Sequence, residues 1–173
     1  MDLSKFIEVL AFTLPAVVTG LVAFYFFRLH VSNEDKRRNF LIQKEAQKIA
    51  LPLRLQAYER LTLFLERISP AKLLLRVKPT GKDPDKYAQK LIQIIEQELE
   101  HNLAQQVYVS ETAWKAVLTS KNVTIKMIRG AVEKEEVQDP ATLQQDILQT
   151  IVKIDSPNSA ALAFLRLEVQ KMF

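Results

Sequence analysis

The sequence predicts an all-α protein, built as one N-terminal transmembrane helix, a charged helical stalk and a bundle of about five to six helices. Three observations predict this class. Glycine occurs only three times in 173 residues, too rarely for the tight turns of a sheet protein. Apolar residues recur with the period of a helix, and no stretch sustains the alternation of a strand. Ser-Pro and Asp-Pro pairs, which open helices, recur between the apolar segments.

The first element is an apolar run from Val9 to Phe27, which contains no charged residue. At about 1.5 Å per residue, its nineteen residues reach roughly 28 Å as a helix, close to the hydrocarbon thickness of a bilayer. A signal peptide is disfavoured because the chain starts MDLSKFIE, which is not basic, and no small-residue cleavage site follows the run. A buried core helix is disfavoured because the run is apolar on every side. We therefore expect residues 1–28 to be an uncleaved membrane anchor.

Basic residues flank the anchor unequally, which predicts its orientation. Lys5 is the only one on the N-terminal side, whereas residues 28–48 contain six. We expect the N-terminus to lie outside and the rest of the chain in the cytoplasm, at the inner membrane if the cell is bacterial. The densest basic cluster can face anionic lipid headgroups, at about 1 kcal/mol per residue, although topology alone also accounts for it. That cluster is Lys36, Arg37 and Arg38.

Helices continue behind the anchor. Residues 32–50 are polar and lack glycine and proline, which predicts a juxtamembrane stalk over residues 29–50. Pro52 then predicts a kink or a fresh start. Residues 51–173 are expected to form the cytoplasmic helical domain. Its expected elements are a helix over 53–68, a short turn after Pro70, a helix over 84–107, one after Ser110 that continues or breaks near 120–122, and two opened by Pro140 and Pro157.

One arginine lies inside the apolar face of the expected helix 53–68, whose other arginines, Arg60 and Arg67, lie at its solvated margin. Arg54 falls between two leucines on that face, and an unpaired buried guanidinium would cost several kcal/mol. Glu98 and Asn102 lie inside the apolar stripe of the helix 84–107. We therefore expect Arg54 to meet Glu98 and Asn102 in a structural polar pair. The alternative is that Arg54 extends to water at the frayed start of its helix.

The C-terminal segment NSAALAFLRLEVQKMF is apolar on more than one side of the expected helix. Such a helix must be buried on more than one side, either inside the bundle or against another protein. We expect it to provide a face for a protein partner or for self-association. Packing inside the bundle remains the alternative. The residues concerned are Phe164, Leu165, Leu167, Val169, Met172 and Phe173.

The sequence offers no recognisable chemical site. Cysteine is absent, and the two histidines, His30 and His101, are far apart and lack a spaced metal-ligating partner. Three isolated glycines cannot form a phosphate-binding loop, and runs of acids on helices are typical of solvated faces. We therefore expect no catalytic residue, no cofactor and no metal. Nucleic-acid binding is not expected, because basic residues beyond Ala50 are interleaved with acids.

Three blocks carry a resemblance to a known family: LPLRLQAYERLTLFLERISP, the KLLLRV behind it, and IIEQELEHNLAQQVYVS. Over roughly residues 10–130, the chain resembles a family of uncharacterised small bacterial single-span membrane proteins with a helical cytoplasmic region. The first block is the most specific. The resemblance implies the anchor, the stalk and the helical cytoplasmic portion, and it implies no activity.

Together these features predict a membrane-anchored, non-enzymatic helical scaffold or adaptor that binds other proteins at the cytoplasmic face. One alternative is a membrane-organising protein that binds lipid headgroups through its stalk. The other is an enzyme with an unrecognised site.

Overall fold

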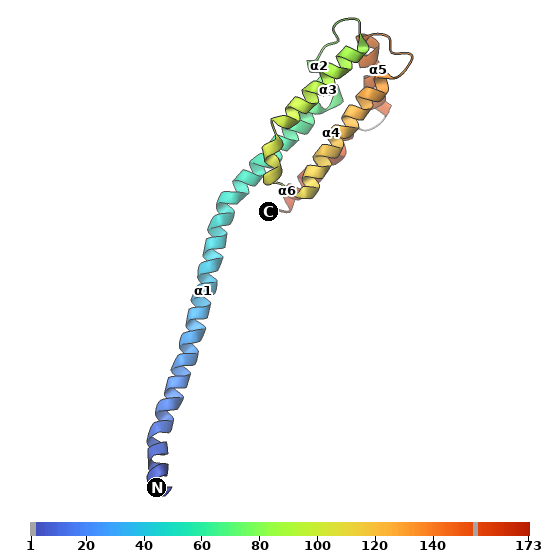
Figure 1. The fold of residues 1–173 in the computed structure, drawn as a ribbon. Coiled ribbons are helices and arrows are strands. Elements are labelled where there is room, and N and C mark those ends of the chain that lie inside the picture. The colour runs from blue at the N-terminus through green and yellow to red at the C-terminus, as the bar shows by residue number, and fades with distance from the viewer. Residues whose placement is uncertain (1–2, 154–155) are drawn as a thin grey trace. The chain divides into compact units, whose positions relative to one another are not determined.

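The computed structural model describes residues 3–153 and 156–173, and every regular element in those ranges is helical (Figure 1). The prediction of an all-α protein is confirmed for the described residues. The chain divides into two compact units, residues 1–50 and 51–173. Its elements are α1 (Leu3–Ile68), α2 (Pro70–Arg76), α3 (Pro84–Glu100), the 3₁₀ helix η1 (Leu103–Val107), α4 (Glu111–Val132), α5 (Pro140–Lys153) and α6 (Pro157–Gln170).

The first unit is the beginning of α1. Residues 3–50 are helical, and every side chain from residue 13 to residue 50 is exposed. Residues 1 and 2 of the expected anchor lie outside the described residues. This unit therefore has no core of its own among the residues that the structure describes.

The second unit is an up-and-down helical bundle (Figure 1). We call the successive segments that run up or down the bundle its legs. In chain order they are the part of α1 after residue 50, α3, α4, and finally α5 followed by α6. The third leg, α4, packs against α3, α5 and α6, and the short α2 packs against α5. The loop between α2 and α3 turns at Gly81, whose φ of 87° lies in the left-handed region that favours glycine.

The apolar face predicted for residues 53–68 is confirmed in its larger part. Six of its members are at most 2% exposed, but Leu53 is 48% exposed and lies outside the core. Burial of a large apolar side chain stabilises a fold by about 1.5–3 kcal/mol, so this face is a principal attachment of α1 to the bundle. The six are Ala57, Tyr58, Leu61, Phe64, Leu65 and Ile68.

One expected helix boundary is wrong, and one of the two alternatives at Pro52 is excluded. α1 continues through Pro52 without a fresh start, because the segment is exposed there and water can bond the carbonyl that the proline leaves without a donor. The helix expected to reach residue 107 ends at Glu100 and is followed by η1. There the Asn102 Nδ2 donates to the Glu98 carbonyl at 2.8 Å and takes the place of a backbone donor. Near residue 120, where a break was an open alternative, α4 is continuous.

Candidate functional site

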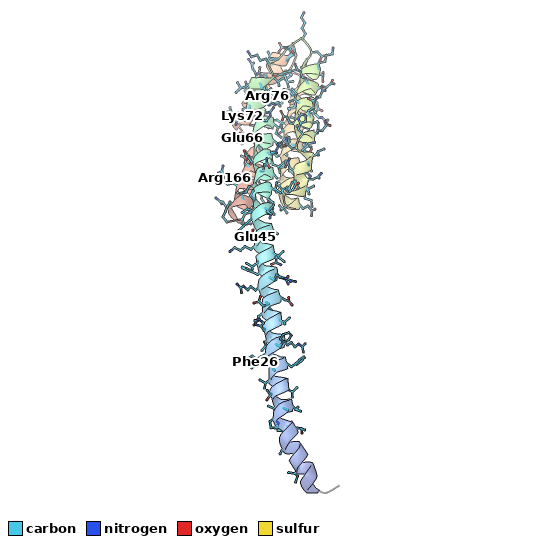
Figure 2. All side chains as sticks on the ribbon, turned by 90° about the vertical axis from the view of Figure 1, so that its left-hand side faces the viewer. Phe26, Glu45, Glu66, Lys72, Arg76 and Arg166 are labelled. Carbon is cyan, nitrogen blue, oxygen red and sulfur yellow. The ribbon has the colours of Figure 1, made fainter. Side chains whose placement is uncertain are left out.

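The apolar part of α1 over residues 13–27 is the first candidate site. Its large apolar side chains are 49–69% exposed, and Figure 2 shows Phe26 directed away from the helix. Among the described residues, one helix is long and apolar enough to cross a membrane, judged by length and composition alone. An exposed apolar surface of this extent marks a membrane or interaction site. The side chains are Leu14, Val17, Val18, Leu21, Val22, Phe24, Tyr25, Phe26 and Phe27.

One polar group of this segment, the Thr19 hydroxyl, is satisfied within the helix. The Thr19 hydroxyl donates to the Pro15 carbonyl at 2.8 Å, a bond four residues back along the chain. Such a bond needs no water, so the hydroxyl is compatible with apolar surroundings.

The basic cluster behind the apolar segment is fully exposed. Lys36, Arg37 and Arg38 are consecutive, and successive residues of an α-helix point about 100° apart. Lys36 and Arg38 therefore point about 160° apart, to nearly opposite sides of the helix, and Arg37 lies between them. The Arg37 Nη1 lies 3.9 Å from the Glu34 Oε1, and both side chains are exposed.

The predicted pairing of Arg54 with Glu98 is wrong. Arg54 is exposed, and its Nε donates to the Tyr108 carbonyl at 3.3 Å. The register of the legs places the end of η1, and not Glu98, beside Arg54. This outcome is close to the alternative in which Arg54 extends to the surface.

Glu98 instead joins two other arginines. Its Oε1 accepts from Arg67 Nε at 2.9 Å and lies 2.7 Å from Arg67 Nη2 and 3.5 Å from Arg76 Nη2. The Glu98 side chain is 15% exposed, whereas that of Arg67 is 56% exposed. Arg67 therefore does more than cover apolar surface at the margin. Asn102, the third member of the expected set, contributes through its bond to the Glu98 backbone carbonyl.

A second polar cluster ties α6 to the rest of the bundle. The Tyr58 hydroxyl donates to the Glu168 Oε2 at 2.5 Å. The Ser110 hydroxyl lies 2.7 and 2.8 Å from the two carboxylate oxygens, and Thr112 Oγ1 lies 3.4 Å from Oε1. Ser110 also caps α4 by accepting from the Ala113 N–H at 3.0 Å. One carboxylate thus links α6 to α1 and to the start of α4.

The same contacts shift the ionisation of both partners. Burial, followed by the hydrogen bond to Glu168, raises the pKa of Tyr58. Burial also acts to raise the pKa of Glu168, but hydrogen bonds from Tyr58, Ser110 and Thr112 outweigh it and leave that pKa below its ordinary value. The cluster therefore contains an ionised carboxylate and a neutral phenol, which is a structural tie and not an acid–base pair poised near neutrality.

The C-terminal helix is only partly an exposed face. Leu165 is 1% exposed and belongs to the core, so its assignment to an interaction surface is wrong. The reason is that α6 packs along α4 and places Ala161 and Leu165 inward. Leu167 and Phe173 remain 56% and 85% exposed. The half-buried residues that pack against the core are Phe164, Val169 and Met172.

A shallow groove of about 380 Å³ runs between α1 and α6 beside this polar cluster. Tyr58 and Leu165 contribute buried surface to it, and Leu162 and Val169 contribute half-buried side chains. Charged residues of both signs border the apolar part, namely Glu59, Glu66 and Arg166.

A family model matches residues 4–172, almost the whole chain. The chain belongs to DUF7935, a family of unknown function. The match extends to residue 172, whereas the sequence resemblance covers only roughly residues 10–130. No curated protein and no solved structure matches the chain. Family membership therefore identifies no activity for this DUF7935 protein.

Metal chemistry finds no support in the described part of this DUF7935 protein. No three His, Asp or Glu side chains of residues 3–153 and 156–173 are grouped so that they could hold a metal ion. His30 and His101 are both exposed.

The cluster around Glu168 is the arrangement that sequence reasoning missed in this DUF7935 protein. Two signals pointed to it separately: Ser110 is a clear helix cap, and Glu168 interrupts an apolar segment. Their meeting across 58 positions of the chain depends on how the legs of the bundle pack, which neither signal contains.

Proposed function

We propose that this DUF7935 protein is a membrane-anchored helical scaffold or adaptor without catalytic activity. In this proposal the apolar part of α1 crosses the inner membrane of a bacterium once, and the bundle binds other proteins at the cytoplasmic face. The observation that carries the proposal is the exposed apolar surface of residues 13–27.

Solvation is the physical reason. Leaving a large apolar side chain in water forgoes about 1.5–3 kcal/mol of burial, and nine such side chains lie within residues 13–27. A helix satisfies its own backbone in lipid, and the Thr19 hydroxyl is satisfied inside it. A bilayer is therefore the environment that fits this segment.

Orientation follows from charge. Six basic residues between positions 28 and 48, against Lys5 on the other side, favour a cytoplasmic location for the bundle. The partners are then proteins that lie in or near the cytoplasmic face, and the groove between α1 and α6 offers one apolar surface to them.

Alkaline extraction of the full chain from membranes tests the anchor. Val18→Lys should release the chain, because a lysine at the centre of a span raises the insertion free energy by about 2.5–3.5 kcal/mol. Val123→Lys, at a 45% exposed position of the bundle, is the matched control and should leave the chain in the membrane. Complete extraction of the parent chain by alkali would contradict the anchor.

A reporter fused after Phe173 tests the orientation. It should behave as cytoplasmic, and replacing Lys36, Arg37 and Arg38 by glutamine should weaken that bias. A parent chain with an external C-terminus would reverse the assignment of partners.

A further inference from the structure

The stretch of α1 from Lys36 to Lys48 carries a basic face that membrane anchoring leaves unused. Lys36, Phe40, Lys44 and Lys48 are spaced four residues apart in a continuous helix, so they follow one side of it. Arg37 and its helical neighbour Leu41 extend the same side, and we call these six residues the basic face.

The acidic residues of this stretch lie on the flank and the far side of the helix. Glu34 and Glu45 make exposed ion pairs with the edge of the basic face, at 3.9 Å to Arg37 and 2.7 Å to Lys48. Exposed pairs of this kind contribute about 0–1 kcal/mol, so they do not neutralise the face. Lys36 and Lys44 have no carboxylate within 4.0 Å among the described residues.

Two apolar side chains lie midway along the length of the basic face. Phe40 is 63% exposed and Leu41 is 50% exposed, with Lys36 and Arg37 before them and Lys44 after them. At about 100° per residue, Arg37 and Lys44 fall between these two side chains around the helix. A surface that mixes apolar and basic side chains fits a ligand that mixes apolar and acidic ones.

A lipid surface is too far away to be that ligand, given the proposed anchor on which this inference rests. If the span ends at Phe27, a helix rising about 1.5 Å per residue places Lys44 roughly 25 Å and Lys48 roughly 31 Å beyond it. The headgroup region is only about 5–8 Å deep on each side, and charges are screened over about 8 Å at physiological salt. Only the first residues of the basic face come close to the headgroups.

A second copy of the chain is also a poor ligand in a symmetric pair. Anchors inserted in one membrane hold two copies parallel, and a two-fold contact brings each surface against itself. Basic face would then meet basic face, which is destabilising.

We propose that the basic face binds a helix of a second protein, one face of which carries both apolar side chains and aspartate or glutamate. The partner helix lies along residues 36–48, with its apolar side chains on Phe40 and Leu41 and its carboxylates near Arg37 and the lysines. Its chemistry is thus that of an acidic amphipathic helix.

Binding of a designed probe to the full chain in phosphatidylcholine nanodiscs tests this proposal. The probe is a heptad-repeat peptide with leucine at the seam positions and glutamate beside them, compared with the same peptide carrying lysine. The glutamate peptide should bind and the lysine peptide should not. Lys36→Gln with Lys44→Gln should weaken binding about tenfold, by the loss of two charge contacts.

The control variant Arg38→Gln with Lys90→Gln removes the same net charge at exposed positions that are not members of the basic face and should change binding less than twofold. Equal losses in the two variants would overturn the proposal, as would tighter binding of an RNA oligonucleotide than of the glutamate peptide. Association of the chain with itself that Lys36→Gln with Lys44→Gln abolishes would overturn it as well.

A depth measurement separates this proposal from the anchor. The chain contains no cysteine, so Val22→Cys and Lys44→Cys each give a single site for a spin label. In vesicles containing phosphatidylserine, the label at position 22 should lie in the hydrocarbon and the label at position 44 in water. A label at 44 that enters the bilayer would overturn the acidic-helix proposal alone, whereas an aqueous label at 22 would overturn the anchor.

Discussion

Phe26 and Phe64 lie in the same helix, yet the first is 66% exposed and the second is 1% exposed. Both stretches around them are rich in large apolar residues. Around Phe64 most of these residues keep to one face, although Leu63 is 54% exposed, and charged residues such as Glu59 and Arg60 occupy the other side. Around Phe26 they surround the helix. The distribution of apolar residues, and not their number, separates a helix that its own chain can cover from one that needs another environment.

The largest effect on stability is expected at Phe64, the buried phenylalanine of the two. Phe64→Ala should lower the free energy of unfolding of the bundle by about 3–5 kcal/mol, because it removes a fully buried ring and leaves a cavity. Urea denaturation of the full chain in detergent measures it, with the fluorescence of Trp114, the one tryptophan, as a reporter inside the bundle.

Phe26→Ala is the matched control for that measurement. It removes the same ring from an exposed position of the first unit and should change the free energy of unfolding of the bundle by less than about 0.5 kcal/mol. Comparable losses of unfolding free energy in Phe64→Ala and Phe26→Ala would mean that the two stretches share one folding unit.

A smaller effect is expected at the tie between α1, α4 and α6. Glu168→Gln should lower the free energy of unfolding by about 1–3 kcal/mol, because hydrogen bonds to a charged group are replaced by weaker neutral ones. Tyr58→Phe should cost somewhat less, since Glu168 keeps its bonds from Ser110 and Thr112.

The pH dependence of these two variants has opposite signs. The folded pKa of Glu168 lies below its unfolded value of about 4.3, so its contribution is lost as the pH falls through the lowered pKa. The folded pKa of Tyr58 lies above its unfolded value of about 10, so its contribution is lost as the pH rises through the raised pKa. The difference between parent and Glu168→Gln should shrink in acid, and that between parent and Tyr58→Phe should shrink in alkali. Differences that are constant with pH would show that the hydrogen bonds are not formed.

Two arginines of α1, Arg67 and Arg54, should differ by a smaller amount in their effect on the free energy of unfolding. Arg67→Ala should lower the free energy of unfolding by about 1 kcal/mol, because Glu98 is largely buried and keeps only the longer contact to Arg76. Arg54→Ala should change it by less than about 0.5 kcal/mol, since the exposed guanidinium makes one bond to the Tyr108 carbonyl. Urea denaturation of both variants measures the contrast, and an Arg54 effect above that of Arg67 would contradict the assignment of Glu98 to Arg67.

Sequence patterns predicted local features well and the meeting of distant residues poorly. Helix class, the cap at Ser110, and the inward face from Ala57 to Ile68 follow from neighbours along the chain, so periodicity and capping chemistry suffice. The partner of Glu98 depends on the register between legs of the bundle, and several registers satisfy the same apolar stripes. The burial of Leu165 similarly depends on which side α6 turns towards α4.

The smallest effect on stability is expected at Leu167 and Phe173. Both are apolar and exposed in the second unit, as the residues around Phe26 are in the first. Leu167→Gln with Phe173→Gln should therefore change the free energy of unfolding by less than about 0.5 kcal/mol. If this face binds the proteins of the proposed scaffold, the same variant should lose the cross-linked products that the full chain forms in membranes. Val152→Gln, at an 88% exposed apolar position of α5, is the control and should keep them. Cross-linking that survives the double change would place the binding surface elsewhere, and a large loss of stability would instead show that these two side chains are covered by the bundle itself.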